Sequence, residues 1–330
     1  MRPTALPIAA VLLFAVAAAP SVADVTGYEV VSATSPAASN TSKSLLVECP
    51  DGKFALGGGT STFGAGVPAS HTPATIWMNA PAGFPIATGW NGAAHCDCPA
   101  AANWGLRVDV ICGEAPGLER VNSFTPLSSN DTRFTQAICS VGNAALSGGA
   151  QTSGSISSTA LLESVESTAA AYDFNAGWAA SARGPASSSW GLQSVAICAD
   201  AATTTVANYT STATSTGPDL LHVSTCPDGL VAIGGAARAV PINNATGTDE
   251  ARLTSIAPDG PTAAPTGWTA TARRPASNTA EWRLTVGVVC VPEAEASPLA
   301  SVAMLALGAA ARRRRARPIA AQARVHRPGV

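Results

Sequence analysis

The chain contains the same pattern of residues three times, and this repetition constrains its fold more than any other feature. Each copy has a leading cysteine, a glycine pair, a Gly-Trp pair, and a second tryptophan eight residues before a closing cysteine. The leading cysteines Cys49, Cys139 and Cys226 lie 90 and 87 residues apart. A fixed period of this length is typical of an architecture made of repeated supersecondary units. The sequence predicts three repeats of about 90 residues, at 24–115, 116–202 and 203–292.

Residue alternation inside each repeat indicates β-strands. From Trp282 to Cys290 every second side chain is apolar, which places the tryptophan and the closing cysteine on one buried face. The Pro-Asp-Gly after Cys49 and Cys226 is turn chemistry, and the glycine pair that follows fits a strand with a bulge or a close backbone approach. Only 12% of the residues are charged, as expected of short strands rather than helices. The fold class is therefore all-β, with five or six antiparallel strands per repeat.

Two arrangements of the repeats fit this pattern. One is a row of three small sandwiches, each stapled by its own disulfide, and the other is a single body with threefold pseudosymmetry. The Cys-Pro-Asp-Gly turn followed by a glycine-containing strand, and the alternating strand that ends in Cys, resemble the repeat of vitelline membrane outer layer proteins. That resemblance implies three sheets arranged as a β-prism, and hence the single body. The pattern also resembles a repeat of exported bacterial proteins whose role is not known.

Six of the eight cysteines bracket the repeats. Because each repeat holds one opening and one closing cysteine, pairing within the repeat is the simplest connectivity. The expected disulfides are Cys49–Cys112, Cys139–Cys198 and Cys226–Cys290. Closing a loop of about 60 residues stabilises a fold by roughly 4 kcal/mol in the chain-entropy model. Such pairs also predict an oxidising, extracytoplasmic compartment.

Cys96 and Cys98 have no counterpart in the other two repeats. The simplest interpretation is a local disulfide between them, which requires the backbone to bend. The alternatives are a redox-active pair and a metal site, because His95 and Asp97 lie beside the two cysteines and His71 is a further possible ligand. We expect the local disulfide, and no metal.

The two ends of the chain have the composition of export signals. Arg2, the apolar run at 8–19 and the small residues Ser21-Val22-Ala23 form a secretory signal over residues 1–23. Between Asp24 and Pro292 there are 11 basic and 19 acidic residues, a net charge of −8. This balance argues against nucleic acid or an anionic membrane surface as a partner.

The C-terminal end carries Val291-Pro292-Glu293, an apolar stretch at 299–311, and four arginines at 312–315. This order resembles the PEP-CTERM sorting tail of Gram-negative bacteria, with Ala294 at the place of the second proline. The resemblance implies that residues 293–315 insert transiently into the membrane, that a sorting protease cuts near Pro292, and that residues 316–330 are a cytoplasmic or disordered tail.

Residues with catalytic potential are scattered. No histidine recurs at the same repeat position, and the common hydrolase, zinc-protease and phosphate-loop motifs are absent from the sequence. We therefore expect no catalytic residue, no cofactor and no metal. Trp77 is the one tryptophan outside the repeated framework and, with His71, is the best candidate for ligand contact. The variable loop at 243–250 has oxygen ligands suited to calcium but fits a solvated loop better.

The leading hypothesis is a non-catalytic exported protein, secreted or held in the cell envelope or extracellular matrix, with a structural or adhesive role. The alternative is a lectin-like module that binds extracellular polysaccharide or another envelope component. A third hypothesis is a disulfide-stabilised hydrolase with its site between repeats, which would need two carboxyl groups facing one cleft.

Overall fold

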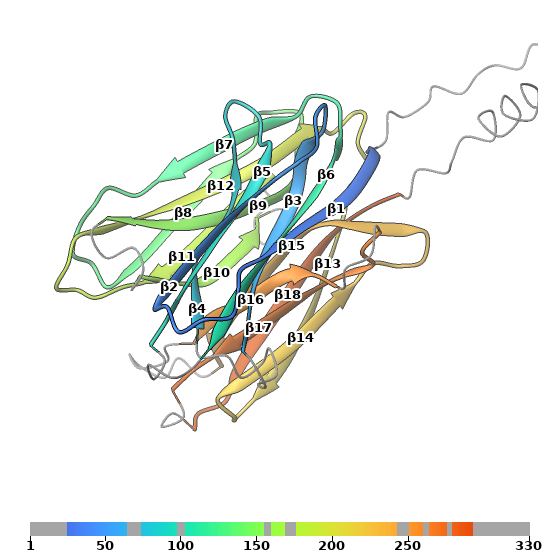
Figure 1. The fold of residues 1–330 in the computed structure, drawn as a ribbon. Coiled ribbons are helices and arrows are strands. Elements are labelled where there is room, and N and C mark those ends of the chain that lie inside the picture. The colour runs from blue at the N-terminus through green and yellow to red at the C-terminus, as the bar shows by residue number, and fades with distance from the viewer. Residues whose placement is uncertain are drawn as a thin grey trace, which may run out of the picture.

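The computed structural model describes residues 25–64, 74–97, 103–154, 160–168, 176–242, 251–259, 264–275 and 279–292. Within these ranges the chain forms eighteen β-strands and no helix, which confirms the all-β prediction (Figure 1). The described residues accordingly offer no helical segment that meets the length and apolarity needed to cross a membrane. The signal and tail segments, His71 and the loop at 243–250 lie outside the described residues.

Each repeat contributes six strands. Repeat 1 forms β1 (Thr26–Thr34), β2 (Ser42–Glu48), β3 (Phe54–Gly64), β4 (Ala74–Ala82), β5 (Gly89–Cys96) and β6 (Trp104–Glu114). Repeat 2 forms β7 (Glu119–Phe124), β8 (Thr132–Ile138), β9 (Asn143–Gly154), β10 (Leu161–Ser167), β11 (Gly177–Arg183) and β12 (Trp190–Asp200). Repeat 3 forms β13 (Ala207–Ser215), β14 (Asp219–Thr225), β15 (Leu230–Pro241), β16 (Arg252–Pro258), β17 (Gly267–Arg273) and β18 (Trp282–Pro292).

The strands form three six-stranded antiparallel sheets, and every sheet is shared by two repeats. Sheet A has the order β1-β6-β3-β16-β17-β14, sheet B the order β2-β5-β4-β9-β12-β7, and sheet C the order β13-β18-β15-β10-β11-β8. Repeat 1 thus supplies half of sheets A and B, repeat 2 half of B and C, and repeat 3 half of C and A (Figure 1). This cyclic exchange excludes three separate sandwiches and confirms the single body with threefold pseudosymmetry.

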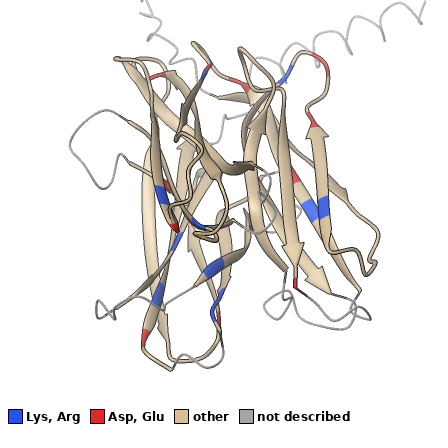
Figure 2. Cartoon of the chain, turned by 90° about the vertical axis from the view of Figure 1, so that its left-hand side faces the viewer, with Lys and Arg blue, Asp and Glu red and all other residues tan. Residues whose placement is uncertain are grey.

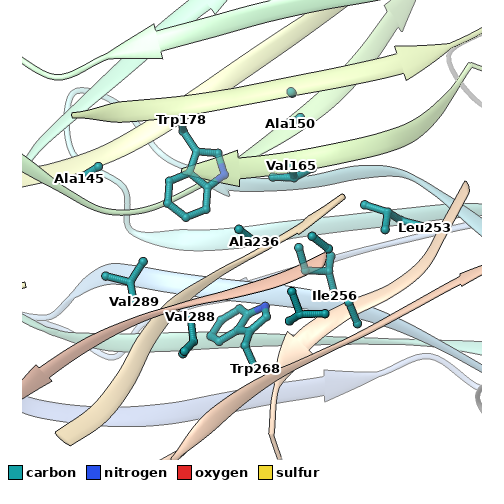
Figure 3. Close-up of a cluster of buried hydrophobic side chains, with 14 of the residues drawn as sticks. Ala145, Ala150, Val165, Trp178, Ala236, Leu253, Ile256, Trp268, Val288 and Val289 are labelled. Carbon is teal, nitrogen blue, oxygen red and sulfur yellow. The ribbon is translucent and has the colours of Figure 1, made fainter. Parts of the chain in front are cut away.

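The joint between two repeats within a sheet is short. In sheet A it consists of two register pairs, Ser255 with Ser61 and Ile256 with Thr60, and sheets B and C have the same two-pair joint between β4 and β9 and between β10 and β15. The repeats are held together mainly through their interior instead. One buried cluster includes Trp178 from repeat 2 together with Trp268 from repeat 3 (Figure 3).

A β-bulge in β3, β9 and β15 brings the three repeats together at one point. The bulged residues are Leu56, Leu146 and Ile233, all fully buried. The residue that follows each bulge faces a backbone carbonyl of another repeat: a Cβ on Gly57 would lie 1.8 Å from the oxygen of Ile233. In repeat 2 a serine takes this place, and its hydroxyl donates to the carbonyl of Leu56 at 2.5 Å. The predicted bulge and close approach are both present.

The glycine two residues after each bulge explains why the glycine pair and the Gly-Trp pair occur together. A Cβ on Gly58, Gly148 or Gly235 would lie 2.4, 2.3 or 2.0 Å from the ring of the Gly-Trp tryptophan of the same repeat. The indole therefore packs flat against bare backbone. All six tryptophans of the repeated framework are at most 1% exposed, as expected for core residues.

The three predicted disulfides are present. Cys49–Cys112, Cys139–Cys198 and Cys226–Cys290 have Cα separations of 5.5, 5.9 and 5.9 Å. Three bridges within one chain are typical of an oxidising, extracytoplasmic compartment. Cys96 is also disulfide-bonded, whereas Cys98 lies outside the described residues, so their pairing stays a prediction.

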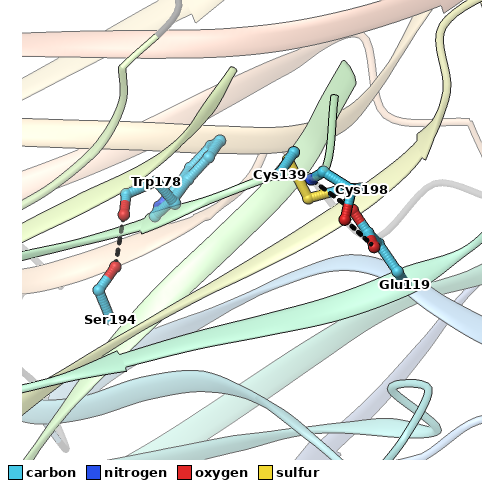
Figure 4. Close-up of a disulfide and its surroundings, with 6 residues drawn as sticks. Glu119, Cys139, Trp178, Ser194 and Cys198 are labelled. Atoms are coloured by element: carbon cyan, nitrogen blue, oxygen red, sulfur yellow. Dashed lines mark hydrogen bonds between the residues drawn. A yellow bond between two sulfur atoms is a disulfide. The ribbon is translucent and has the colours of Figure 1, made fainter. Parts of the chain in front are cut away.

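Repeat 2 lacks the Pro-Asp-Gly sequence but keeps the turn, with the Asn143 backbone nitrogen donating to the Ser140 carbonyl and Gly142 at positive φ. Glu119 accepts hydrogen bonds from the backbone nitrogen and the hydroxyl of Ser140, both at 2.8 Å, beside the Cys139–Cys198 bridge (Figure 4). Burial of Glu119 opposes its ionisation, but these bonds and one from Asn143 prevail and lower its pKa. The carboxylate thus adds two hydrogen bonds to Ser140, the residue that stands where the other repeats have proline.

A cation covers the second tryptophan in all three repeats. Lys43 lies 5.3 Å from the ring centre of Trp104, Arg133 lies 4.9 Å from that of Trp190, and Arg274 lies 5.6 Å from that of Trp282. Lys43 and Arg133 occupy matching positions in β2 and β8, but the cation of repeat 3 follows β17. The cation–π contact is therefore present in all three repeats, although in repeat 3 the cation comes from a different position in the sequence.

Candidate functional site

Because the three repeats are related by threefold pseudosymmetry, residue positions shared by all three can be told apart from positions at which one repeat differs. Positions with the same kind of residue in all three repeats point into the core, as the glycines and tryptophans do. Outward positions are free of that constraint, so a site is expected where one sheet departs from the other two. Sheet C departs most clearly.

The outer face of sheet C carries a hollow of about 210 Å³ at the joint between repeats 2 and 3. We call this the sheet C hollow. It is lined by Glu166, Ser167, Thr210, Ala236, Ala237, Arg238, Thr285 and Gly287. Small residues of β15 and β18 form its floor, while charged and hydroxyl side chains surround it. A concave surface with a few converging polar groups is the usual form of a small-ligand site.

The hollow exists because β18 has a glycine where the other sheets have a larger side chain. Gly287 is the fifth residue after Trp282, and the matching residues are Asp109 in sheet A and Val195 in sheet B. In sheet A the Asp109 carboxylate accepts hydrogen bonds from Arg107, at 2.9 Å from Nε and 2.7 Å from Nη2, and from Ser32. The position is thus filled by the Asp109 side chain in sheet A, whereas in sheet C it is open because Gly287 has no side chain.

The charged pair of the hollow keeps hydrogen-bonding capacity. Oε1 of Glu166 lies 3.7 Å from Nη1 of Arg238, which is too long for a hydrogen bond, and the two side chains are 25% and 52% exposed. Burial raises the pKa of Glu166, against the opposing effects of Arg238 and a hydrogen bond from Ser164. The Ser167 hydroxyl is buried and has no hydrogen-bond partner among the described residues, but Ser167 pairs in register with Trp178, so its side chain faces the interior and not the hollow.

A register row of polar side chains crosses sheet C beside the hollow. It runs through all six strands as Thr212, Thr285, Arg238, Ser164, Ser181 and Phe134. Phe134 closes the row on the edge strand β8 and is 58% exposed. Its neighbours in the strand alternate, with Thr135 and Ala137 buried, so the phenylalanine ring faces outward.

A second hollow, of about 590 Å³, lies at the turn after Cys226. Its lining is the turn Cys226-Pro227-Asp228-Gly229 and neighbouring small or aliphatic residues, with Asp228 as the one charged side chain. It is larger than the sheet C hollow, but its described lining has Thr225, Asp228 and Thr266 as polar side chains and no cation beside the carboxylate. We therefore place the candidate site on sheet C.

Trp77, which the sequence singled out for ligand contact, is not at this site. Trp77 lies at a bulge in β4 and is half-buried, with its indole nitrogen buried and without a hydrogen-bond partner among the described residues. His71 lies outside the described residues, so its contact with a ligand stays a prediction. In the described part of the chain no three His, Cys, Asp or Glu side chains are placed to hold a metal ion.

The His95 imidazole contacts two side chains, one through each ring nitrogen. Its Nδ1 lies 3.0 Å from the Ser42 hydroxyl, and its Nε2 lies 3.1 Å from Oδ1 of Asp97. A hydrolytic triad uses the two nitrogens the other way round and a buried carboxylate, whereas Asp97 is 80% exposed. The three side chains therefore form a surface hydrogen-bond chain.

The fold and the hollow together define a closed three-sheet β protein with a shallow polar surface site. No protein-family model and no curated protein sequence matches the chain. Sequence reasoning missed Glu166, Arg238, Gly287 and Phe134. Alignment of the three repeats could have pointed to this site, because it places Gly287 at the position of Asp109 and Val195.

Proposed function

We propose that this chain is a non-catalytic exported protein of the cell envelope or extracellular matrix, with a structural or adhesive role. The observation that carries the proposal is the closed body itself: three shared sheets, each repeat stapled by a disulfide. Such a body resists unfolding outside the cell without metal or cofactor. Charged side chains are few along its strands (Figure 2), so contact of the sheet faces with other surfaces would desolvate few charges.

The two ends of the sequence support export. The signal-like segment at 1–23 directs secretion, and the tail at 293–315 inserts transiently in the membrane until a sorting protease releases or transfers the body. The chemistry of the hollow supports binding rather than catalysis. Glu166 is the only carboxylate among its lining residues, whereas glycoside hydrolysis uses two.

Fractionation with thiol trapping tests this function. Cells producing the full-length chain are separated into cytoplasmic, membrane and external fractions, and free thiols are labelled with a maleimide before and after reduction. We expect the chain outside the cytoplasm, with its cysteines labelled only after reduction. A cytoplasmic pool whose cysteines react directly would contradict the proposal. Adhesion is checked by sedimenting the purified chain with isolated envelope and matrix material, and a chain that stays in the supernatant would contradict that role.

A lectin-like role is the second candidate function. The sheet C hollow favours it, because converging hydroxyl, carboxylate and guanidinium groups are the groups that hydrogen-bond to sugars.

A further inference from the structure

We propose that the outer face of sheet C binds a neutral polysaccharide laid across its strands, from the hollow at Glu166 and Arg238 to the ring of Phe134. This deepens the lectin-like candidate and rests on the extracytoplasmic location proposed above. It names a site, a direction on the sheet and a ligand class.

The distance between the two ends of this face suits an extended polymer. Neighbouring strands of a sheet lie about 4.8 Å apart. Arg238 on β15 and Phe134 on β8 are three strands apart in the order β15-β10-β11-β8, so about 14 Å separates them. Ser164 and Ser181, whose hydroxyl oxygens lie 2.8 Å apart, occupy the two strands between them. A ligand that reaches both ends is therefore several linked sugar units long.

The side chains of the hollow match a sugar ring in kind. The Glu166 carboxylate accepts hydrogen bonds from sugar hydroxyls, and Arg238 donates to hydroxyl or ring oxygens. Ala236 and Gly287 allow the ring to approach the backbone closely.

Phe134 supplies the apolar contact at the other end. The face of an aromatic ring is electron-rich and attracts the weakly positive C–H groups that line one side of a pyranose. Its 58% exposure and its place on an edge strand leave that face accessible. What distinguishes Phe134 from other exposed apolar side chains is its place in the register row that contains Arg238 of the hollow.

The charges on this face favour a neutral polymer. Glu166 lies beside Arg238, and Glu163 beside Arg183 with Nε at 2.9 Å, so two pairs of opposite charge offset one another. The body as a whole carries a net charge of −8 between Asp24 and Pro292. A polyanion would meet that acidic body, whereas hydroxyl groups meet no such penalty.

Native affinity electrophoresis of the full-length chain tests the proposal. The chain migrates through gels containing soluble dextran, xylan or hydroxyethyl cellulose, and its retardation gives an apparent Kd. We expect retardation by at least one of these polymers, unchanged by 0.5 M sodium chloride. Phe134→Ala should weaken it about tenfold and Glu166→Gln about fivefold, the losses typical of a stacked ring and a charged hydrogen bond.

Phe124→Ala is the matched control, because Phe124 is 65% exposed on the edge strand β7 of sheet B, beside a sheet centre that is filled. It should bind as wild type does. The proposal is overturned if none of the polymers retards the wild type, if Phe134→Ala binds normally, or if Phe124→Ala weakens binding equally. It is also overturned if only a carboxylated polymer such as alginate retards the chain and salt abolishes the effect. Thermal melting of each variant confirms that it is folded. A chain that is exported but binds none of the polymers would contradict this inference and would leave the proposed structural or adhesive function unaffected.

Discussion

The centres of sheets A and C occupy the same place in the threefold pattern and differ in almost every outward side chain. In sheet A, Asp109 is 4% exposed and holds Arg107 by two hydrogen bonds, so the surface is filled. In sheet C, Gly287 stands at the matching position, and the charged pair beside it is 3.7 Å apart, with Glu166 25% and Arg238 52% exposed. The inward side chains at the two centres are nonetheless alike: tryptophan, valine and glycine pack in the same way.

This difference shows that inward and outward positions have different roles in the protein. Inward positions are fixed because three repeats must meet around shared glycines and tryptophans, and an error there disturbs all three sheets. Outward positions contribute little to that packing, so each sheet can change its surface without changing the fold. The following experiments test how far this division holds.

The largest effect is expected at the shared framework. Gly235→Ala places a Cβ about where the Trp268 ring lies, at 2.0 Å, and should lower the free energy of unfolding by about 3 kcal/mol or more. Gly58→Ala and Gly148→Ala should cost similar amounts, because each meets its own tryptophan in the same way. Guanidinium denaturation measures all three. If one repeat tolerated the change at a cost below about 1 kcal/mol, the framework would not be equivalent in the three repeats.

The next effect separates sheet A from sheet C. Asp109→Ala leaves the Arg107 guanidinium and the Ser32 hydroxyl without their acceptor and should cost about 2 kcal/mol. Glu166→Ala, at the open centre, should change stability by less than about 0.5 kcal/mol. The double variant Arg107→Ala with Asp109→Ala should regain part of the lost free energy of unfolding, because it leaves no unpaired guanidinium. Urea denaturation measures the free energy of unfolding of the three variants. Equal losses at Asp109 and Glu166 would show that sheet C is filled as well.

A smaller effect concerns pH. Because burial raises the folded-state pKa of Glu166, the folded chain binds more protons than the unfolded chain between the ordinary glutamate pKa and the raised one. Its contribution to stability is therefore lost as pH rises through that window. Glu166→Gln should remove this dependence and above the window raise the free energy of unfolding by about 0.5 kcal/mol. Melting temperature measured against pH records the slope.

Glu119→Gln is a control for which the expected pH dependence of stability has the opposite sign, because the pKa of Glu119 is lowered and that of Glu166 is raised. The pKa of Glu119 is lowered by its hydrogen bonds to Ser140, so its contribution is present above the ordinary glutamate pKa and is lost as pH falls. This variant should be less stable than wild type at neutral pH and should approach it in acid. The same slope for both variants would contradict the assigned directions.

The smallest change in stability is expected when the hollow is filled. A Cβ on Gly287 would lie 3.1 Å from the Cβ of Ala236, so Gly287→Ser requires only a small shift and should alter stability by less than about 0.5 kcal/mol. It should nevertheless reduce retardation by the neutral polysaccharide to that of Glu166→Gln or below. Unchanged binding would place the ligand elsewhere on the sheet.

Much of the fold was predictable from local patterns. Alternation from Trp104 to Cys112 and its two counterparts located the strand next to one edge of each sheet, and cysteine order gave the three bridges. The glycine pair was correctly interpreted as a bulge with a close approach. The cation over Trp282 was not predictable, because Arg274 replaces a residue that the other repeats supply from a different strand.

The sequence by itself determined the period, the strands, the disulfide pairs and the buried tryptophans, because each depends on residues within one repeat and on the turns between them. Only the tertiary structure decided which strands share a sheet. A strand has the same alternation whether its neighbour comes from its own repeat or another, and the joints between repeats are only two register pairs long. The sheet C hollow lies across such a joint, with Glu166 from repeat 2 and Arg238 from repeat 3. Its residues come together only when the three repeats close around their common core.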